Sequence, residues 1–318
     1  MKTHFIFIAA ITFLFSGINA QTKETGPYTV STISPGVFHI EDANKSNPAG
    51  PHTGADGVVS TNNCSDMYVV QGTDKILLID LSNFIRWDTG AVQSLRSITN
   101  ELRGGRKLYI TVTHNHGDHL GMLPAFKDDP GVTFWIPAEE FKTRPVFPDE
   151  RTIKFEENAS LDLGNGVVVN TFEVPGHTAH STIFFLKEKN LVFTGDAIGS
   201  GNGVWLFNYD SFITYRNSID RLIKYIKAPD NKVNTENLTI YGGHYWQKGN
   251  AEKLTSQYIF DMQTLIGKIG NGEATKEKVT YNKYLDTNFK YGTATITWNE
   301  ADALRYREVT KVTKVTSD

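Results

Sequence analysis

The segment from Thr113 to His119 holds the densest group of potential metal-binding side chains in the sequence. It reads Thr-His-Asn-His-Gly-Asp-His and follows an apolar run that predicts a buried strand over 107–113. Imidazole nitrogens and carboxylate oxygens are the ligands that zinc takes in catalytic sites, where one position stays open for water. In a turn that leaves a strand, side chains two apart converge on one side, and the next pair reaches a neighbouring point. The spacing therefore favours two adjacent metals over one. The candidate ligands are His114, His116, Asp118 and His119.

Three later segments repeat the arrangement of a candidate ligand at the end of a predicted strand. The candidates are His177 after the strand 167–174, Asp196 after the strand 190–194 and His244 after the strand 238–241. Each has a glycine directly before it, and glycine lets the backbone pass close to a metal and adopt positive φ. Each segment alone is a weak signal. Together, and in this order after the histidine-rich segment, they are a strong signal for a metal centre.

The remaining sequence predicts strands that alternate with helices, which is typical of an α/β layered fold. Further strands are predicted over 28–41, interrupted at Pro35-Gly36, in a hairpin of 67–70 with 75–80, and over 181–186. Apolar residues at helical spacing predict helices over 89–103, 209–226 and 251–269.

With these motifs in these positions, the sequence resembles the metallo-β-lactamase superfamily. This family includes glyoxalase II, N-acyl-homoserine lactonases, several phosphodiesterases and the class B β-lactamases. The resemblance runs from about Tyr28 to His244 and through the following helix. The HxHxDH motif of the family matches residues 114–119, and its later histidine, aspartate and last histidine match His177, Asp196 and His244. The resemblance implies a four-layer αββα sandwich, in which helices cover two mixed sheets.

The resemblance also implies a binuclear site and its ligands. The first metal would be held by His114, His116 and His177. The second would be held by Asp118, His119 and His244, with Asp196 bridging the two. Asp80, at the end of the strand 76–79, matches an earlier aspartate of the family that supports the metal loop through hydrogen bonds. Two zinc ions suit this ligand set, and iron and manganese remain open.

The function implied by the resemblance is hydrolysis at a binuclear metal centre. A hydroxide that bridges the metals would be available near neutral pH, because coordination lowers the pKa of water from about 15.7 to about 7. It would attack an ester, lactone or phosphodiester bond, with Asp118 and Asp196 as the catalytic carboxylates.

A class B β-lactamase of the B3-like type is the alternative, since one subclass of these enzymes shares the HxHxDH motif. The sequence Gly195-Asp196-Ala197 counts against it. In that place β-lactamases usually carry a Cys or Ser next to the second metal and lack a bridging aspartate. A di-iron oxidoreductase or a non-catalytic binding module is a third reading. Nothing after Gly270 resembles a flavin-binding domain, and a binding module would not need seven intact ligands.

Four further residues are candidates for a substrate pocket: His180, Trp205, Tyr245 and Trp246. The aromatic residues flank the predicted metal site, where they could form the walls of a pocket for an apolar or ring-bearing substrate. Ordinary core packing explains them equally well. For His180, a hydrogen-bonded position at the start of a strand is the favoured alternative. The segment 137–151, rich in proline and charge, is either a lid or a long connection.

The N-terminal residues 1–20 have the pattern of a secretory signal peptide. Lys2 precedes an apolar run from Phe5 to Phe15, and small residues lead to a cleavage position after Ala20. The run is shorter than the roughly 18–20 apolar residues of a membrane-spanning helix. We therefore expect an exported protein, periplasmic or secreted, with no membrane anchor after cleavage.

Composition bears on the partners of the protein. The formal net charge is -3 and the pI is about 6.3, without a long basic run, so electrostatics give no reason to expect nucleic acid. We expect a small-molecule substrate, and the sequence does not specify the oligomeric state. We divide the chain into the signal peptide 1–20, a catalytic domain 21–272 and a polar C-terminal extension 273–318. The extension either packs on the core or forms a small appendage, with one possible strand at 293–298.

Overall fold

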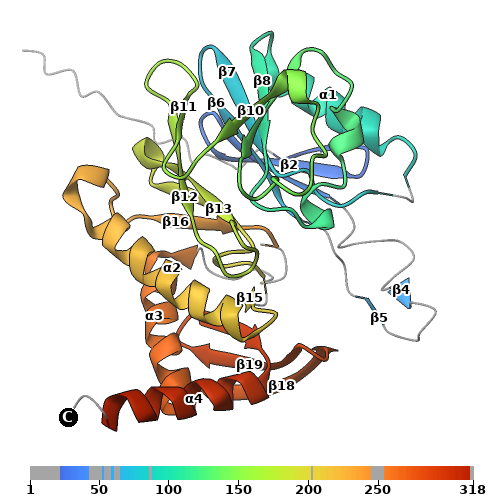
Figure 1. Ribbon diagram of the computed structural model, residues 1–318. Coiled ribbons are helices and arrows are strands. Elements are labelled where there is room, and N and C mark those ends of the chain that lie inside the picture. The colour runs from blue at the N-terminus through green and yellow to red at the C-terminus, as the bar shows by residue number, and fades with distance from the viewer. Residues whose placement is uncertain are drawn as a thin grey trace, which may run out of the picture.

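Two β-sheets lie face to face at the centre of the structure, and helices cover their outer sides (Figure 1). The structure is a computed structural model that describes residues 22–42, 52–53, 59–60, 65–85, 88–201, 203–244 and 254–315. Within these residues the architecture is the α/β four-layer sandwich that the sequence predicted. The predicted signal peptide lies outside the described residues.

The first sheet has eight strands in the order β1-β2-β3-β6-β7-β8-β9-β10 within the described chain. The strands are β1 (Thr22–Thr25), β2 (Tyr28–Ser34), β3 (Val37–Asp42), β6 (Met67–Gln71), β7 (Lys75–Ile79), β8 (Lys107–Thr111), β9 (Val132–Pro137) and β10 (Thr152–Phe155). The predicted hairpin is confirmed as β6 and β7, and α1 (Ala91–Arg103) covers the outer face. A separate short ladder joins β4 (His52–Thr53) to β5 (Val59–Ser60).

The second sheet has six strands among the described residues, in the order β11-β12-β13-β14-β16-β17. The strands are β11 (Ser160–Asp162), β12 (Val168–Glu173), β13 (Thr182–Leu186), β14 (Leu191–Gly195), β16 (Thr239–Gly242) and β17 (Leu254–Thr255). Its outer face is covered by α2 (Tyr209–Lys227) and α3 (Ser256–Asn271). The prediction began α3 at residue 251, but 254–255 pair with β16 as a strand and the helix begins at Ser256.

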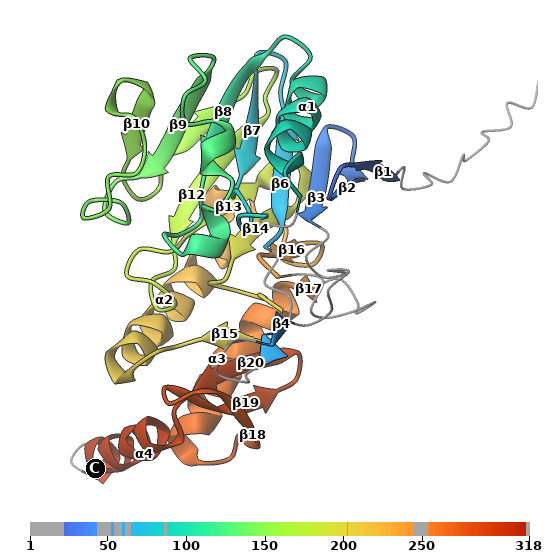
Figure 2. The same cartoon turned by 90° about the vertical axis from the view of Figure 1, so that its right-hand side faces the viewer.

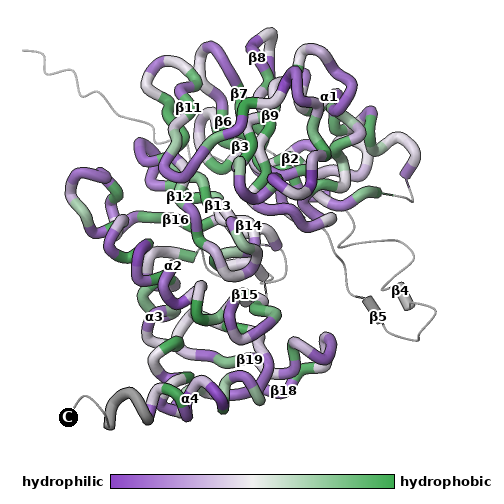
Figure 3. Tube along the Cα trace, in the orientation of Figure 1, coloured by the Kyte–Doolittle hydropathy of each residue, from purple (hydrophilic) through white to green (hydrophobic). Residues whose placement is uncertain are grey.

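Alternation along the central strands explains the layers. In β7, Ile76 and Leu78 belong to the hydrophobic cluster under α1, whereas Leu77 and Ile79 belong to the cluster between the two sheets. Successive side chains of a strand point to opposite faces, so a strand that is apolar on both faces must be covered on both sides. Figure 3 shows the hydrophobic residues concentrated along these central strands and the hydrophilic residues along the loops.

The strand directions place the candidate ligands at one edge of the sandwich. β7 and β8 run parallel in the first sheet, and β14 and β16 run parallel in the second. The carboxyl ends of parallel strands meet at the same edge. Asp80, His114, Asp196 and His244 follow the ends of these strands.

The C-terminal segment forms a third sheet with one short strand from the middle of the chain. Its order is β15-β20-β19-β18, built from β15 (Val204–Trp205), β18 (Thr275–Asn282), β19 (Leu285–Tyr291) and β20 (Ala294–Trp298). This sheet lies with α4 (Glu300–Val315) at the end of the molecule away from β8–β10 (Figure 2). The sequence predicted only the strand at 293–298. Buried residues of the C-terminal sheet share a hydrophobic cluster with α2 and α3. In this cluster Trp298 stacks on Phe212, with the ring centres 4.0 Å apart.

Among the described residues, no helix combines the length and the apolar character that crossing a membrane requires.

The stack between Trp298 and Phe212 predicts a large contribution of the C-terminal segment to stability. Because the Trp298 indole is fully buried, we expect Trp298→Ala to lower the free energy of unfolding by about 3–5 kcal/mol, measured by urea denaturation. Leu304→Ala, at an exposed position of α4, is the control and should change it by less than about 0.5 kcal/mol. Equal effects of the two substitutions would contradict this packing.

Candidate metal centre

Asp80 holds the loop that carries the HxHxDH motif. It lies directly after β7, and its carboxylate accepts hydrogen bonds from the backbone N–H of Thr113 at 2.7 Å and from the Thr113 hydroxyl at 2.9 Å. The same carboxylate lies 2.9 Å from Nδ1 of His119. One buried carboxylate thus connects the start and the end of the motif, and the structure places Asp80 where it orients a candidate ligand.

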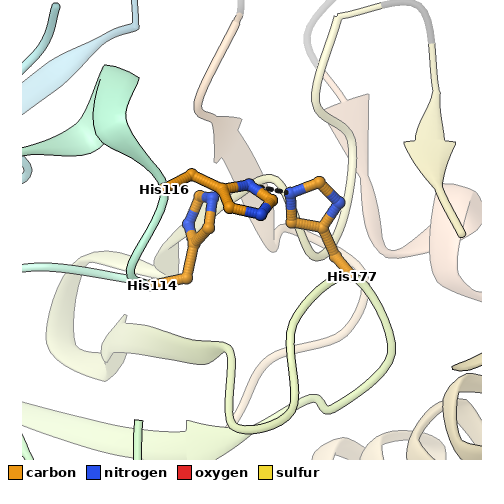
Figure 4. Close-up of side chains that lie close together, drawn as sticks. All are labelled: His114, His116 and His177. Carbon is orange, nitrogen blue, oxygen red and sulfur yellow. Dashed lines mark hydrogen bonds between the residues drawn. The ribbon is translucent and has the colours of Figure 1, made fainter. Parts of the chain in front are cut away.

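Three imidazoles converge from two loops to form the histidine cluster, which comprises His114, His116 and His177 (Figure 4). One ligand nitrogen from each ring lies within 4.8 Å of the others. Nε2 of His177 is 3.0 Å from Nδ1 of His116. His114 and His116 follow β8, and His177 follows β12 of the other sheet, so the cluster joins the two sheets.

In His177 and His114, the hydrogen bond made by Nδ1 determines that Nε2 is the nitrogen free to bind a metal. Nδ1–H of His177 donates to the backbone carbonyl of Trp205 at 2.9 Å, which leaves Nε2 with its lone pair. The Thr113 hydroxyl donates its single proton to Asp80, so Nδ1–H of His114 donates to the Thr113 oxygen at 2.9 Å. Nε2 of His114 therefore also presents a lone pair.

A second group, the carboxylate cluster, lies beside the first and comprises Asp118, His119, Asp196 and His244. Its ligand atoms also lie within 4.8 Å of one another. Nε2 of His244 is 3.4 Å from a carboxylate oxygen of Asp118 and 3.4 Å from one of Asp196. Nε2 of His119 is 3.4 Å from the other oxygen of Asp196.

Asp196 lies between the two clusters. Its Oδ2 is 3.5 Å from Nε2 of His177 in the histidine cluster and 3.4 Å from Nε2 of His244 in the carboxylate cluster. The hydroxyl of Ser200 donates to Oδ1 at 2.7 Å and so fixes the orientation of the carboxylate. This placement suits a carboxylate that two metals share.

The electrostatics of the two clusters differ. Burial, with repulsion from neighbouring histidines, lowers the pKa of His114 well below its usual range and lowers the pKa of His116 to about 4. Burial also lowers the pKa of His177. The histidine cluster is therefore neutral near pH 7, which is the protonation state that binds metals.

In the carboxylate cluster, the nearby carboxylates affect the histidine pKa values more strongly than burial does. Burial alone would lower the pKa of His119 and His244, but nearby carboxylates outweigh it. Asp80 and Asp196 raise the pKa of His119 well above its usual range, and Asp196 and Asp118 raise that of His244 to about 10. The carboxylates thus hold positive charge in this buried place, and a metal ion would supply the same charge.

The residues fit a metal cofactor. Nε2 of His114 is buried and has no hydrogen-bond partner among the described residues, and Nε2 of His119 has only the 3.4 Å contact with Asp196. A buried polar atom without a partner costs about 1–3 kcal/mol, so such atoms need an explanation. A metal within reach of each cluster would coordinate these nitrogens, and imidazole with carboxylate is the donor set that zinc prefers.

Two glycines that precede candidate ligands allow neighbouring loops to approach each other closely. Gly195 has a φ of +48°, and a Cβ there would lie 2.2 Å from Oγ1 of Thr113. A Cβ on Gly243 would lie 2.5 Å from a carboxylate oxygen of Asp196. The close approach is between loops that carry candidate ligands, because a side chain at either glycine would push these loops apart.

Glu140 is a residue that the sequence analysis missed. The residue is 3% exposed, and its carboxylate accepts the backbone N–H of Asn115 and the backbone N–H of His180, each at 2.9 Å. It therefore ties the loop of His114 and His116 to the loop of His177. Glu140 lies in the segment interpreted as a lid or a long connection, and a lone glutamate there gave no signal.

A cavity of about 250 Å³ opens onto both clusters. It is lined by His116, Asp118, His177, Asp196, Ser200, Gly203, Trp205, Phe207 and His244. Trp205 was a candidate pocket residue, whereas Ser200 and Phe207 were missed.

His180 is not among the described residues that line this cavity. Its ring nitrogen Nδ1 lies 3.5 Å from the Glu173 carboxylate, and its backbone bonds to Glu140. A histidine hydrogen-bonded at the start of β13 was the favoured alternative, and the placement agrees with it. The candidates Tyr245 and Trp246 lie outside the described residues.

The four-layer fold and the two adjacent ligand clusters define a class of metal-binding proteins. The family model of the metallo-beta-lactamase superfamily matches residues 65–244, which is more than half of the chain. The chain belongs to this superfamily.

Curated relatives resemble part of the chain. A hydroxyacylglutathione hydrolase from Brucella anthropi is 31% identical over 153 residues, which cover 47% of this chain and 52% of that protein. The Beta-lactamase-like protein 2 homolog of Caenorhabditis elegans is 28% identical over 146 residues, which cover 44% of this chain and 48% of the relative. The chain thus spans about half the length of the curated relatives it matches.

Solved structures share the fold. A metallo-β-lactamase from Erythrobacter litoralis superposes with a TM-score of 0.54 at 17% identity, covering 78% of this chain and 100% of that one. The metallo-β-lactamase FIM-1 from Pseudomonas aeruginosa, solved in a mono-zinc form, superposes with a TM-score of 0.53 at 16% identity, covering 77% and 97%. At these identities the likeness shows the fold alone.

The two hydrogen bonds of Glu140 predict that it supports metal binding from a distance. We expect Glu140→Ala to lower the free energy of unfolding by about 3 kcal/mol, because two buried N–H groups lose a charged acceptor. We also expect zinc affinity to fall about 10- to 100-fold, because both ligand loops become freer. Chelator competition measures the affinity.

The matched control is Glu139→Ala, which removes an exposed carboxylate from the neighbouring position. It should leave zinc affinity and stability unchanged. A Glu140→Ala variant that unfolds more easily but binds zinc with unchanged affinity would show that Glu140 has no part in positioning the ligands.

Proposed function

We propose that this protein is an exported binuclear zinc hydrolase that cleaves an ester, lactone or phosphodiester-type bond. The observation that carries the proposal is the position of Asp196, whose Oδ2 lies within 3.5 Å of ligand nitrogens from both clusters. Membership of the metallo-beta-lactamase superfamily and the relatives named hydroxyacylglutathione hydrolase support hydrolysis as the reaction class.

The residues divide between two metal positions. The histidine cluster, His114, His116 and His177, would hold one metal. Asp118, His119 and His244 would hold the other, with Asp196 shared between them. When bound, the metals would supply Lewis-acid chemistry and make a hydroxide nucleophile available near neutral pH.

The side chains around the metals orient the reactants. The carboxylates of Asp118 and Asp196 both line the cavity, where they can accept a hydrogen bond from the attacking water and fix its direction. The Ser200 hydroxyl holds Oδ1 of Asp196 at 2.7 Å, which keeps the other oxygen toward the ligand nitrogens. Phe207 contributes an apolar surface beside His116 and His177.

A B3-like β-lactamase is the second candidate, favoured by the shared fold of the solved metallo-β-lactamases and by the HxHxDH motif. The Asp196 carboxylate between the clusters favours the first candidate, since it gives the site a shared anionic ligand. The two candidates differ in substrate, so turnover separates them.

A binuclear hydrolase should show both its metals and its reaction. We expect about two zinc ions per chain by mass spectrometry. We also expect turnover of an aryl ester, a lactone or bis(p-nitrophenyl) phosphate. Asp196→Ala should reduce the zinc content and lower kcat/KM at least about 100-fold, because it removes the shared ligand.

Asp128→Ala, which removes an exposed aspartate from a surface turn, is the control and should leave zinc content and turnover unchanged. Efficient cleavage of nitrocefin that survives Asp196→Ala would favour the β-lactamase. Less than one metal per chain, with no turnover after zinc is added back, would rule out both candidates.

Export is the second part of the proposal, and the pattern of residues 1–20 supports it. Expression of the full chain in a bacterium should yield a periplasmic or secreted protein whose mass corresponds to a chain that begins at Gln21. Replacing Ile8 in the apolar run by Asp should trap an uncleaved chain in the cytoplasm. Cytoplasmic retention of the wild-type chain at full mass would contradict export.

A further inference from the structure

The short strand β15 joins the metal centre to the C-terminal sheet. It pairs in parallel with β20, with Trp205 opposite Thr297, and the backbone N–H of Leu206 donates to the carbonyl of Thr297 at 3.1 Å. At Gly203 the two backbones approach so closely that a Cβ would lie 2.7 Å from the carbonyl oxygen of Thr295. The C-terminal sheet therefore determines the path of the chain through 203–206.

Trp205 lies beside the metal centre. Its carbonyl accepts the Nδ1–H of the candidate ligand His177 at 2.9 Å, and the residue lines the cavity. Two residues further on, Phe207 also lines the cavity, with its ring 5.6 Å from that of His177 and 6.0 Å from that of His116. One wall of the cavity is thus aromatic and stands directly beside the ligands.

The indole of Trp205 is supported from outside the catalytic part of the chain. It stacks on the ring of Tyr281 in β18, with the ring centres 5.0 Å apart and the planes inclined by 29°. Tyr281 is 40% exposed and otherwise resembles an ordinary surface residue. Stacked aromatic pairs are favourable beyond the area that they bury, so the pair restricts the orientation of the indole before any substrate binds.

We propose that Trp205, held by Tyr281 and continued by Phe207, is a subsite for a flat apolar group of the substrate, such as an aromatic ring. The proposal rests on the proposed function, because it places this group beside the bond that the metal centre would cleave. Aromatic walls next to a polar centre bind ring-bearing groups by stacking and leave the reacting bond to the polar side. The C-terminal sheet thereby sets substrate preference.

The test compares alkyl esters with and without a phenyl ring. The substrates are methyl acetate, which has no ring, methyl phenylacetate, which has it on the acyl side, and benzyl acetate, which has it on the leaving-group side. For Tyr281→Ala we expect KM for at least one ring-bearing ester to rise about three- to tenfold. The kcat for that ester, the kcat/KM for methyl acetate and the zinc content should stay within about twofold of wild type.

Two further variants exclude a general structural effect. Tyr281→Phe keeps the ring and should behave like wild type. Tyr284→Ala removes another exposed tyrosine from the same hairpin and should also behave like wild type. An equal loss for ring-bearing and ring-free esters in Tyr281→Ala, or no change for any of them, would overturn the subsite.

A binding measurement separates the failure of this proposal from the failure of the proposed function. Calorimetry with the zinc-loaded protein should show that benzylphosphonate binds more tightly than methylphosphonate, and that Tyr281→Ala reduces this preference. Tighter binding of benzylphosphonate without hydrolysis of any ester would support the subsite and contradict the hydrolase function. Ester hydrolysis together with equal binding of the two phosphonates, or with binding of neither, would contradict the subsite and support the hydrolase function.

Discussion

The buried carboxylate of Asp80 is the interaction on which the arrangement of the site depends. It lies at the end of a strand with hydrophobic neighbours on both faces, and it bonds to Thr113 at the start of the HxHxDH loop and to His119 at its end. A buried charge is stable only when it is paired and hydrogen-bonded. Because these bonds must form, the loop is held against the strand ends, and its imidazoles meet the ligands of the second sheet.

The same requirement explains why the site lies between two sheets. His177, Asp196 and His244 come from the second sheet, and none of them could reach the HxHxDH loop unless the inner faces of the two sheets packed together. The hydrophobic cluster between the sheets supplies that packing. At the site, Glu140 reinforces this packing by accepting a backbone N–H from the loop of His114 and His116 and another from the loop of His177. We therefore expect contacts that are not themselves ligands to link metal binding to folding.

The sequence predicted what is encoded locally. The candidate ligands could be named because each follows an apolar strand and carries its own short motif, and the layered fold followed from alternating strands and helices. Glu140 and Phe207 were missed because their roles arise from contacts distant in sequence, such as Glu140 with His180. For the same reason the polar segment after residue 272 predicted one strand, whereas β19 packs Phe289 into the cluster that contains Trp298, and the largely exposed β18 pairs with β19.

The measurement that tests the central claim most directly is anomalous X-ray diffraction at the zinc edge from crystals of the zinc-loaded protein. The account predicts two anomalous peaks about 3.5–4 Å apart. One should lie within bonding distance of the histidine cluster and the other within bonding distance of the carboxylate cluster, with Asp196 between them. A single peak outside both clusters, or zinc bound only at surface residues, would contradict the account.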